Sequence, residues 1–295
     1  MAEPLASTPD RARRCLLRFG VCLPALLVSG FAVAETTELD RIRARGTLKI
    51  ALYKDNPPYS SGPATRLRGL DVDLADALAR GLGLKLELLP FDAGESVKDD
   101  LRNMVWRGHY LGYGPADVML HVPADARLAR GNPQVAIIEP YLREQLVLLY
   151  DSERIRTVER AEDLKELPLA AERGTGAASM LIGYGGGLLR AQVGLYRDGV
   201  EAARAVLDGK AAAAYLTRAQ AEAALFERSP AVGRYRLAAL GLGHVHAEQG
   251  WAIGMAIKAE HRALGRALEG VMTDLRASGE LRELFRKHGL TLVAP

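Results

Sequence analysis

One candidate binding residue is Tyr59, which follows the first strand-like run of the chain. The apolar, β-prone run 47–53 stops at a loop that contains Pro57 and Pro58 and presents this tyrosine. A tyrosine has an apolar ring and a polar tip, so one that is fixed in a proline loop is suited to form a pocket wall. The alternative is a surface tyrosine that packs on its own prolines.

His121 is a second candidate, because it lies at the end of the apolar run 117–122 (DVMLHV). A histidine at the carboxyl end of a strand can contact a ligand, and its charge changes near neutral pH. A histidine that is satisfied within the end of the sheet is the alternative.

A glycine-rich turn, Gly174-Thr175-Gly176, is the third candidate. It follows the strand-like run 167–171 and opens a predicted helix. Backbone N–H groups at such a turn, together with the positive end of the helix dipole, bind carboxylates and other anions. Turns of this kind also act as simple helix caps, so both roles remain open.

The sequence gives little support for a metal site or a nucleotide-binding site. His244 and His246, two positions apart on a strand, would lie on one face, with Glu248 nearby. No third partner stands at ligand spacing, so we expect a polar segment and no metal. The sequence lacks a phosphate-binding loop, a Ser-His-Asp signature and a nucleotide fingerprint, so we expect no cofactor.

The first 34 residues have the pattern of a cleavable signal peptide. Three arginines within 11–14 precede the apolar run 15–31, and Ala32-Val33-Ala34 forms the cleavage motif. Both cysteines, Cys15 and Cys22, lie in this segment, so we expect no disulfide in the mature chain.

The remaining composition is that of a globular protein. The whole chain is 48% hydrophobic and 25% charged, and residues 35–295 contain 35 basic and 34 acidic residues. A surface so close to neutral argues against nucleic acid or an anionic membrane as the main partner.

Strand and helix patterns alternate in two blocks. In the first block, leucines repeat every four residues in a predicted helix at 70–82, between strands at 47–53 and 85–89. Strand, helix and strand at this spacing predict a βαβ unit and a parallel sheet, and Pro90 should end the second strand. The pattern restarts after about 142–148, which predicts two α/β lobes with the ligand between them. Further predicted elements are a helix at 99–106, strands at 144–150, 211–216, 235–240 and 250–257, a short helix at 164–167, and helices at 200–207, 264–275 and 281–287.

The order of motifs resembles family 3 of the bacterial periplasmic solute-binding proteins, which serve ABC importers for amino acids and other small polar solutes. The resemblance is carried by LKIALYKDNPPYSS, GLDVDLADALA, ADVMLHV, IIEPYL, ERGTG and the C-terminal run from GWAIGMAIK to RKHGL. It implies the type II two-lobe α/β fold with two crossover strands, a periplasmic location and a monomer. It places lobe 1 at 35–142 and 251–295, and lobe 2 at 143–250.

The resemblance also implies roles for individual residues. Tyr59 matches the aromatic that stacks on the ligand, and Arg127 or Arg130 matches the arginine that grips the ligand carboxylate. The turn 174–176 matches the group that binds the same carboxylate. Thr217 stands where amino-acid binders have an aspartate, and a threonine cannot neutralise a buried ammonium, so we expect standard α-amino acids to bind poorly.

Three functions follow from these features. The first is a solute receptor for an ABC importer. The second is an accessory protein of a periplasmic quinoprotein alcohol dehydrogenase or its cytochrome c. That possibility is implied by a second resemblance: the pattern DVMLHVPAD is similar to that of the family-3 subfamily that is associated with quinoprotein dehydrogenases, whose role is maturation or partnering of the enzyme. The insert RNMVWRGHYLGYGPAD adds to it, because Trp106, His109, Tyr110 and Tyr113 could form an aromatic surface for a partner. Local packing of a long loop is the alternative explanation.

The third function is a dehydratase-like enzyme, which the fold analogy allows and the residues do little to support. Glu172 and Glu139 are the carboxylates at the expected cleft edge, and a general acid would need a raised pKa. We therefore expect a binding protein and no catalytic residues.

Overall fold

The computed structural model describes residues 36–231, 233–242 and 249–295. The predicted signal peptide, both cysteines and the segment with His244, His246 and Glu248 lie outside the described residues. Within these ranges, no helix combines the length and the apolar character that crossing a bilayer requires.

The first sheet has the strand order β4-β1-β5-β12-β6. β1 runs parallel to both of its neighbours, as predicted, but β12 is antiparallel to β5 and to β6. The prediction of a parallel sheet is therefore wrong: the sheet is mixed, because β12 runs antiparallel to both of its neighbours. The strands are β1 Thr47–Tyr53, β4 Lys85–Phe91, β5 Val118–Pro123, β6 Val135–Glu144 and β12 Trp251–Lys258.

The prediction that Pro90 ends its strand is wrong, since β4 continues to Phe91. β4 is an edge strand with β1 as its neighbour, and Pro90 pairs in register with Leu52. An edge strand tolerates a proline because the missing N–H can face away from the ladder.

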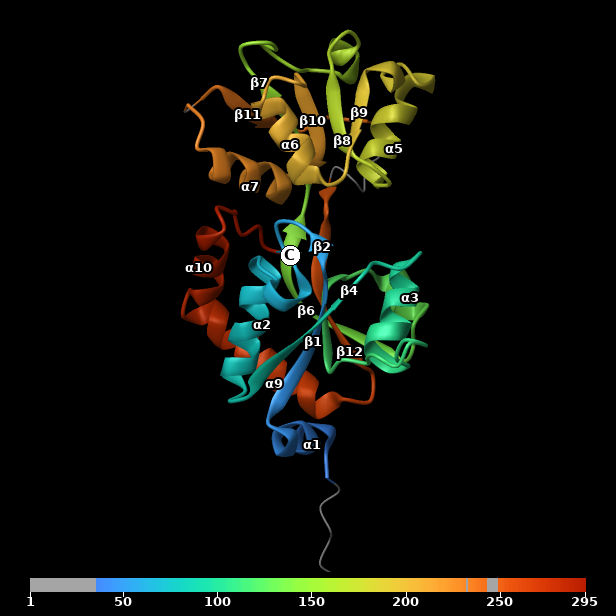
Figure 1. Cartoon of the computed structure of the whole chain (residues 1–295), viewed down its shortest axis with the longest axis vertical. Coiled ribbons are helices and arrows are strands. Elements are labelled where there is room, and N and C mark those ends of the chain that lie inside the picture. The colour runs from blue at the N-terminus through green and yellow to red at the C-terminus, as the bar shows by residue number, and fades with distance from the viewer. Residues whose placement is uncertain (1–35, 232, 243–248) are drawn as a thin grey trace, which may run out of the picture. The chain divides into compact units, whose positions relative to one another are not determined.

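Helices cover both faces of this sheet (Figure 1). α2 Leu70–Gly81 and α9 Arg262–Ala277 pack on the face that holds Leu48, Ile50 and Leu52. α3 Val97–Leu101 and the π-helical turn Arg102–Trp106 pack on the opposite face, with Ala51 and Phe91. The predicted helix at 99–106 is thus a short α-helix that widens into a π turn.

The second sheet has the order β11-β7-β10-β8-β9, in which β7 is antiparallel to β10 and β11. Alternate residues of β10 again serve two faces: Ala214 and Leu216 pack toward α6, while Ala213 and Tyr215 pack toward α5. The sequence analysis did not anticipate β9 or α7. The elements are β7 Leu146–Asp151, β8 Leu169–Glu172, α5 Gly176–Gly183, β9 Val193–Tyr196, α6 Gly199–Leu207, β10 Ala213–Thr217, α7 Arg218–Arg228 and β11 Tyr235–Ala238.

The chain changes from one sheet to the other between Glu144 and Leu146, and it returns to the first sheet at Trp251. We call residues 36–144 with 251–295 the first lobe, and residues 146–242 the second lobe. The remaining elements are α1 Glu38–Arg45, the small hairpin β2 Asp55–Asn56 and β3 Ser60–Ser61, α4 Ala126–Arg130, α10 Glu280–Lys287, and short 3-10 turns at Ala64–Arg66, Ala161–Leu164, Tyr184–Gly186 and Arg190–Gln192. The turn at Ala161–Leu164 replaces the helix that was predicted at 164–167.

Candidate functional site

A cavity of about 890 Å³ is lined by residues of both lobes. Tyr59, His121 and Arg127 of the first lobe line it, as do Thr175, Gly176 and Thr217 of the second. The structure thus brings six of the seven predicted site residues to one cavity. Gly174 is exposed and does not line it, and neither does Arg130, the alternative to Arg127.

Tyr59 is held by the backbone of the helix that follows it. Asp71 N–H donates to the Tyr59 carbonyl at 2.9 Å, and Leu70 N–H donates to the Pro58 carbonyl at 3.2 Å. Gly69 makes this approach possible, because a Cβ at that position would lie 2.2 Å from the Tyr59 oxygen. The start of α2 therefore fixes the tyrosine, whose side chain is 2% exposed and whose hydroxyl donates to the Glu144 carboxylate.

His121 packs against Tyr59 with its ring tilted by 43°, and it is anchored by a buried aspartate. The ring centroids of His121 and Tyr59 are 4.2 Å apart, and His121 Nδ1 lies 3.0 Å from Asp71 Oδ2. The other oxygen of Asp71 accepts from the hydroxyl of Tyr141 at 2.8 Å. His121 has φ of +60°, a left-handed backbone that is uncommon for residues other than glycine, although histidine, asparagine and aspartate adopt it more often than most.

The charge state of His121 follows from these contacts. Burial by itself would lower the pKa of His121, but the charge of Asp71, its hydrogen bond and the more distant Glu144 together raise that pKa above its usual range. The contacts with Asp71 and Glu144 therefore extend the pH range over which His121 carries a positive charge.

Two glutamates that line the cavity also have raised pKa values. Burial raises the pKa of Glu144, although hydrogen bonds from Tyr59 and Thr217 oppose this rise. Burial, with the charge of Asp198, raises the pKa of Glu172, while hydrogen bonds from Gln220 and from the Gly199 N–H oppose it.

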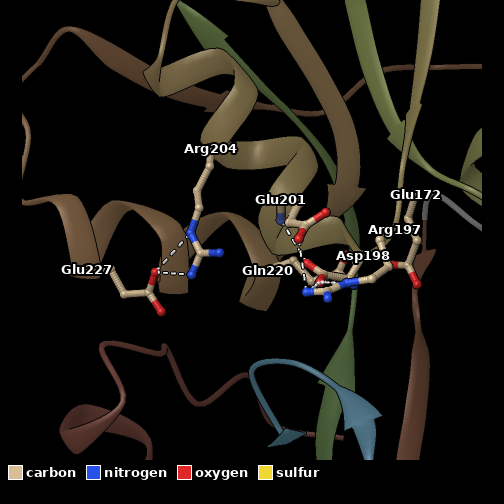
Figure 2. A network of polar contacts seen from close by, with 7 residues as sticks. All are labelled: Glu172, Arg197, Asp198, Glu201, Arg204, Gln220 and Glu227. Atoms are coloured by element: carbon tan, nitrogen blue, oxygen red, sulfur yellow. Dashed lines mark hydrogen bonds and ion pairs between the residues drawn. The ribbon is translucent and has the colours of Figure 1, made fainter. Parts of the chain in front are cut away.

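Glu172 is held by a network that runs along α6 and α7 (Figure 2). Gln220 Nε2 donates to Glu172 Oε2 at 2.8 Å, and Asp198 caps α6 by accepting from the Glu201 N–H at 2.8 Å. Gly199 lets Gln220 approach, since a Cβ there would lie 2.1 Å from its Oε1. The carboxyl of Glu172 is thus fixed at the cavity edge.

Arg127 reaches the cavity from α4, the short helix that begins three residues after β5 ends. Asp125 caps this helix by accepting from the Leu128 N–H at 2.7 Å. Arg127 is exposed and lines the cavity, and its guanidinium makes no ion pair within the described ranges of the chain.

The two threonines use their hydroxyls to cap helices. Thr175 donates to the Glu172 carbonyl at 2.9 Å and accepts from the Ala178 N–H at 3.2 Å, at the start of α5. Thr217 accepts from the Gln220 N–H at 3.3 Å, at the start of α7, and also bonds to Glu144. A ligand would therefore meet the backbone N–H groups of these helix ends more readily than the hydroxyls.

Sequence reasoning missed the buried polar residues that support the site, Asp71, Tyr141, Glu144 and Gln220. One signal was present for Asp71, because it is in phase with Ala75 and Leu78, which lie on the buried face of α2. Glu139, by contrast, does not line the cavity and instead pairs with Arg276 at 2.7 Å.

The described part of the chain contains no candidate metal site. No group of three His, Cys, Asp or Glu residues there is arranged so that it could hold a metal ion. The predicted absence of a metal at His244 and His246 concerns residues outside that part.

Comparison with known proteins identifies the fold. No protein-family model matches the sequence. An ancestral cationic amino acid solute-binding protein is 21% identical, with 84% of this chain and 98% of that one covered at a TM-score of 0.64. An amino acid ABC transporter substrate-binding protein from Streptococcus pneumoniae, bound to L-arginine, is 22% identical over 87% of this chain and 100% of that one, with a TM-score of 0.59. The chain therefore has the two-lobe α/β fold of periplasmic binding proteins, as its sequence predicted.

A curated relative is similar over a shorter stretch. The cyclohexadienyl dehydratase of Pseudomonas aeruginosa is 37% identical over 87 residues, which is 29% of this chain. The match covers about a third (32%) of that protein's length.

Proposed function

We propose that this protein captures a small polar solute between its lobes and delivers it to an ABC importer in the periplasm. The observation that carries the proposal is the cavity of about 890 Å³, which Tyr59, His121 and Arg127 line from the first lobe and Thr175, Gly176 and Thr217 from the second. A cavity that is apolar on some walls and has a few polar groups is the usual form of a small-molecule site.

The mechanism is closure of the two lobes around the solute. A solute contacts both lobes only when they are closed, so it shifts the equilibrium toward the closed state by its extra affinity for that state. We place the hinge near residues 141–146 and, within the described part of the chain, near 249–252, where the chain changes sheets. Small-angle scattering across a library of periplasmic metabolites tests this, with hits first selected by thermal shift. A hit should reduce the radius of gyration, and an unchanged radius at saturation would argue for a scaffold.

We expect the solute to be something other than a standard α-amino acid. Thr217 cannot neutralise an ammonium, and the carboxyls nearest to it already accept hydrogen bonds: Glu144 from Tyr59 and Thr217, and Glu172 from Gln220 and Gly199. The raised pKa of each further weakens it as a partner for a cation.

We propose that the protein binds its solute without converting it. A half-buried Glu172 with a raised pKa has the property of a general acid, and the similarity to a dehydratase covers only 29% of the chain. NMR of each solute in the presence of the protein decides this, because a solute that is only bound keeps its spectrum after release, whereas loss of water from it would make the protein an enzyme.

A second candidate function is docking to a periplasmic quinoprotein alcohol dehydrogenase or its cytochrome c. Its support is the loop after the π turn, where Tyr110 is 88% exposed and Leu111 67% exposed. His109 stacks on Tyr113 there, with the ring centroids 4.3 Å apart, and its ring is tilted against that of Tyr110, with the centroids 4.4 Å apart. Exposed aromatic and apolar side chains of this kind are enriched at the centres of protein interfaces.

The docking candidate is tested by capture of a purified quinoprotein alcohol dehydrogenase on the immobilised protein. The double variant Tyr110→Ser with Leu111→Ser should abolish capture without a change in stability beyond about 0.5 kcal/mol. Equal capture by the variant would argue for simple packing of the loop.

A further inference from the structure

We propose that residues 288–293 form a strap that joins the two lobes beside the crossovers, and that movement of the lobes requires this strap to release the second lobe. The segment follows α10, which belongs to the first lobe, and it contacts α7 of the second lobe. We call the strap engaged when it holds α7 and released when it does not. The inference goes beyond the capture of a solute, because it concerns the lobes of the unliganded protein.

The strap is anchored in the first lobe at its start. His288 Nε2 lies 2.8 Å from the Asp73 carboxylate of α2, and the Leu290 N–H donates to the Phe285 carbonyl at 2.9 Å. The side chain of Leu290 is buried in the hydrophobic core. These contacts order the chain directly after α10, so its continuation toward the second lobe starts from a fixed point.

The strap reaches α7 of the second lobe through a hydrogen bond and an apolar contact. The Thr291 N–H donates to Glu222 Oε2 at 2.7 Å, and the side chain of Glu222 is 13% exposed. Gly289 passes so close to Phe226 that a Cβ at this position would lie 2.2 Å from the ring. The acceptor of the hydrogen bond is a carboxylate that is mostly shielded from water, so this bond is of the stronger, charge-assisted kind.

The strap also pairs with the strand that leaves the first lobe. The Arg143 N–H donates to the Val293 carbonyl at 2.9 Å, and Arg143 directly precedes Glu144, the last residue of β6. The strap therefore lies beside the point where the chain changes sheets. Because Thr291 is held from the first lobe and Glu222 belongs to the second, a rotation of the lobes about this point pulls on the bond between them.

The strap differs from the crossovers in that its connection can break. The crossovers near 144–146 and 249–251 are covalent, whereas the strap holds α7 by the bond to Glu222 and the contact with Phe226. Loss of a hydrogen bond to a charged group changes an equilibrium roughly 10- to 100-fold. A ligand that binds one arrangement of the lobes more tightly can supply such a difference. The strap thus sets how large that difference must be before the lobes move.

Distance measurements between the lobes, without any solute, test the proposal. Nitroxide labels are attached through Lys98→Cys on α3 and Ser179→Cys on α5, both at exposed positions. Cys15→Ser and Cys22→Ser keep the rest of the chain free of label. Glu222→Ala removes the acceptor, and we expect it to raise the ratio of released to engaged molecules on the order of 10- to 100-fold. The distribution of label distances should shift or broaden accordingly.

Further variants assign the effect to the strap. Glu222→Gln retains an acceptor and should change the ratio less than Glu222→Ala. Removal of residues 291–295 should change it at least as much as Glu222→Ala. Adding Glu222→Ala to that deletion should have no further effect, because both changes break the same contact. Glu283→Ala, which breaks an exposed pair with Arg286 inside α10, is the control and should leave the ratio unchanged.

Two results would overturn the proposal. One is an unchanged distribution of label distances in Glu222→Ala, and the other is an equal effect of Glu222→Ala with and without residues 291–295. Neither result depends on a solute, so the proposed capture of a solute would still stand. Conversely, if no metabolite binds, the strap is still tested by these measurements.

Hydrogen exchange in the unmodified protein keeps the proposal testable if a variant fails to fold. The Thr291 amide should exchange about 10- to 100-fold more slowly than in an unstructured chain, because a released strap opens it locally. Absence of protection would mean that the bond to Glu222 does not form. Protection as strong as that of Ile50, in the middle of β1, would mean that the strap opens only on unfolding, and either result would overturn the inference.

Discussion

The hydroxyl of Tyr59 donates a hydrogen bond to the carboxylate of Glu144, which lies 85 residues further along the chain. Glu144 is the last residue of β6, directly before the chain passes into the second sheet, and its side chain is buried. The bond therefore connects the proline loop after β1 to the point where the chain leaves the first lobe. A side chain that lines the cavity is in this way hydrogen-bonded to the residue at which the chain leaves the first sheet.

Replacing Tyr59 with phenylalanine tests the strength of this connection. Tyr59→Phe leaves a buried carboxyl with one donor fewer, and we expect it to lower the free energy of unfolding by roughly 1–3 kcal/mol in urea denaturation. The control is Tyr184→Phe, which removes an exposed tyrosine–glutamate hydrogen bond of 2.9 Å and should cost less than about 0.5 kcal/mol. Similar losses in the two variants would mean that the buried bond has no special role.

The His121–Asp71 pair makes stability depend on pH. The folded pKa of His121 is raised, so its contribution is fully present below the unfolded value, near 6.5, and is lost as pH rises through the folded pKa. NMR titration of the His121 ring and denaturation at each pH should show this loss above about pH 6.5.

Asp71→Asn removes the cause of that shift. The pKa of His121 should fall, the decline in stability above pH 6.5 should flatten, and the free energy of unfolding at pH 6 should drop by roughly 1.5–3 kcal/mol because a hydrogen bond to a charged group is lost. Asp76→Asn, which breaks an exposed pair with Arg80 on the same helix, should cost only about 0.3–0.5 kcal/mol. A His121 pKa that does not move would rule out Asp71 as its cause.

Gly250 allows the returning chain to pass close to Glu144. It has φ of +73°, and a Cβ there would lie 2.1 Å from the Glu144 carbonyl oxygen. Gly46 has nearly the same backbone, φ +75°, with nothing within 4 Å of such a Cβ. Gly46→Ala should therefore cost about 1 kcal/mol from backbone strain alone, and Gly250→Ala several kcal/mol by thermal or chemical unfolding. Equal costs would show that the contact at the hinge relaxes freely.

Thr217 carries no charge that could pair with an ammonium, so we predict that the protein discriminates against α-amino acids. Each α-amino acid is compared by calorimetry with the α-hydroxy acid that has the same side chain. The amino acid should bind more weakly by roughly 3 kcal/mol, or about a hundred-fold, because its ammonium is left without a full counter-charge. Micromolar binding of a standard amino acid would contradict this expectation and would point to Glu144 or Glu172 as the missing partner.

Local patterns were enough to predict most elements of the first lobe. The run 47–53 forms β1 with the predicted bounds, and the leucines at 70, 74 and 78 are fully buried on α2. These features depend on periods of two and of 3.6 residues, which are visible in any short window of sequence. β9 and α7 were missed, since β9 has only four residues and exposes two of them, and the alanine-rich start of α7 has little amphipathic contrast.

In the candidate site, too, some features follow from local sequence and others only from the tertiary structure. By itself, the sequence determined that a tyrosine and a glycine-rich turn follow strands and that a histidine lies within the last residues of one, because turn and strand signals are local. Only the tertiary structure decided that Asp71, Tyr141 and Glu144 surround His121 and Tyr59, since these residues are separated by up to 85 positions and meet through strand pairing and the packing of α2. The physical reason is that the charge and orientation of a buried side chain depend on neighbours in space, which the spacing of residues along the chain does not record.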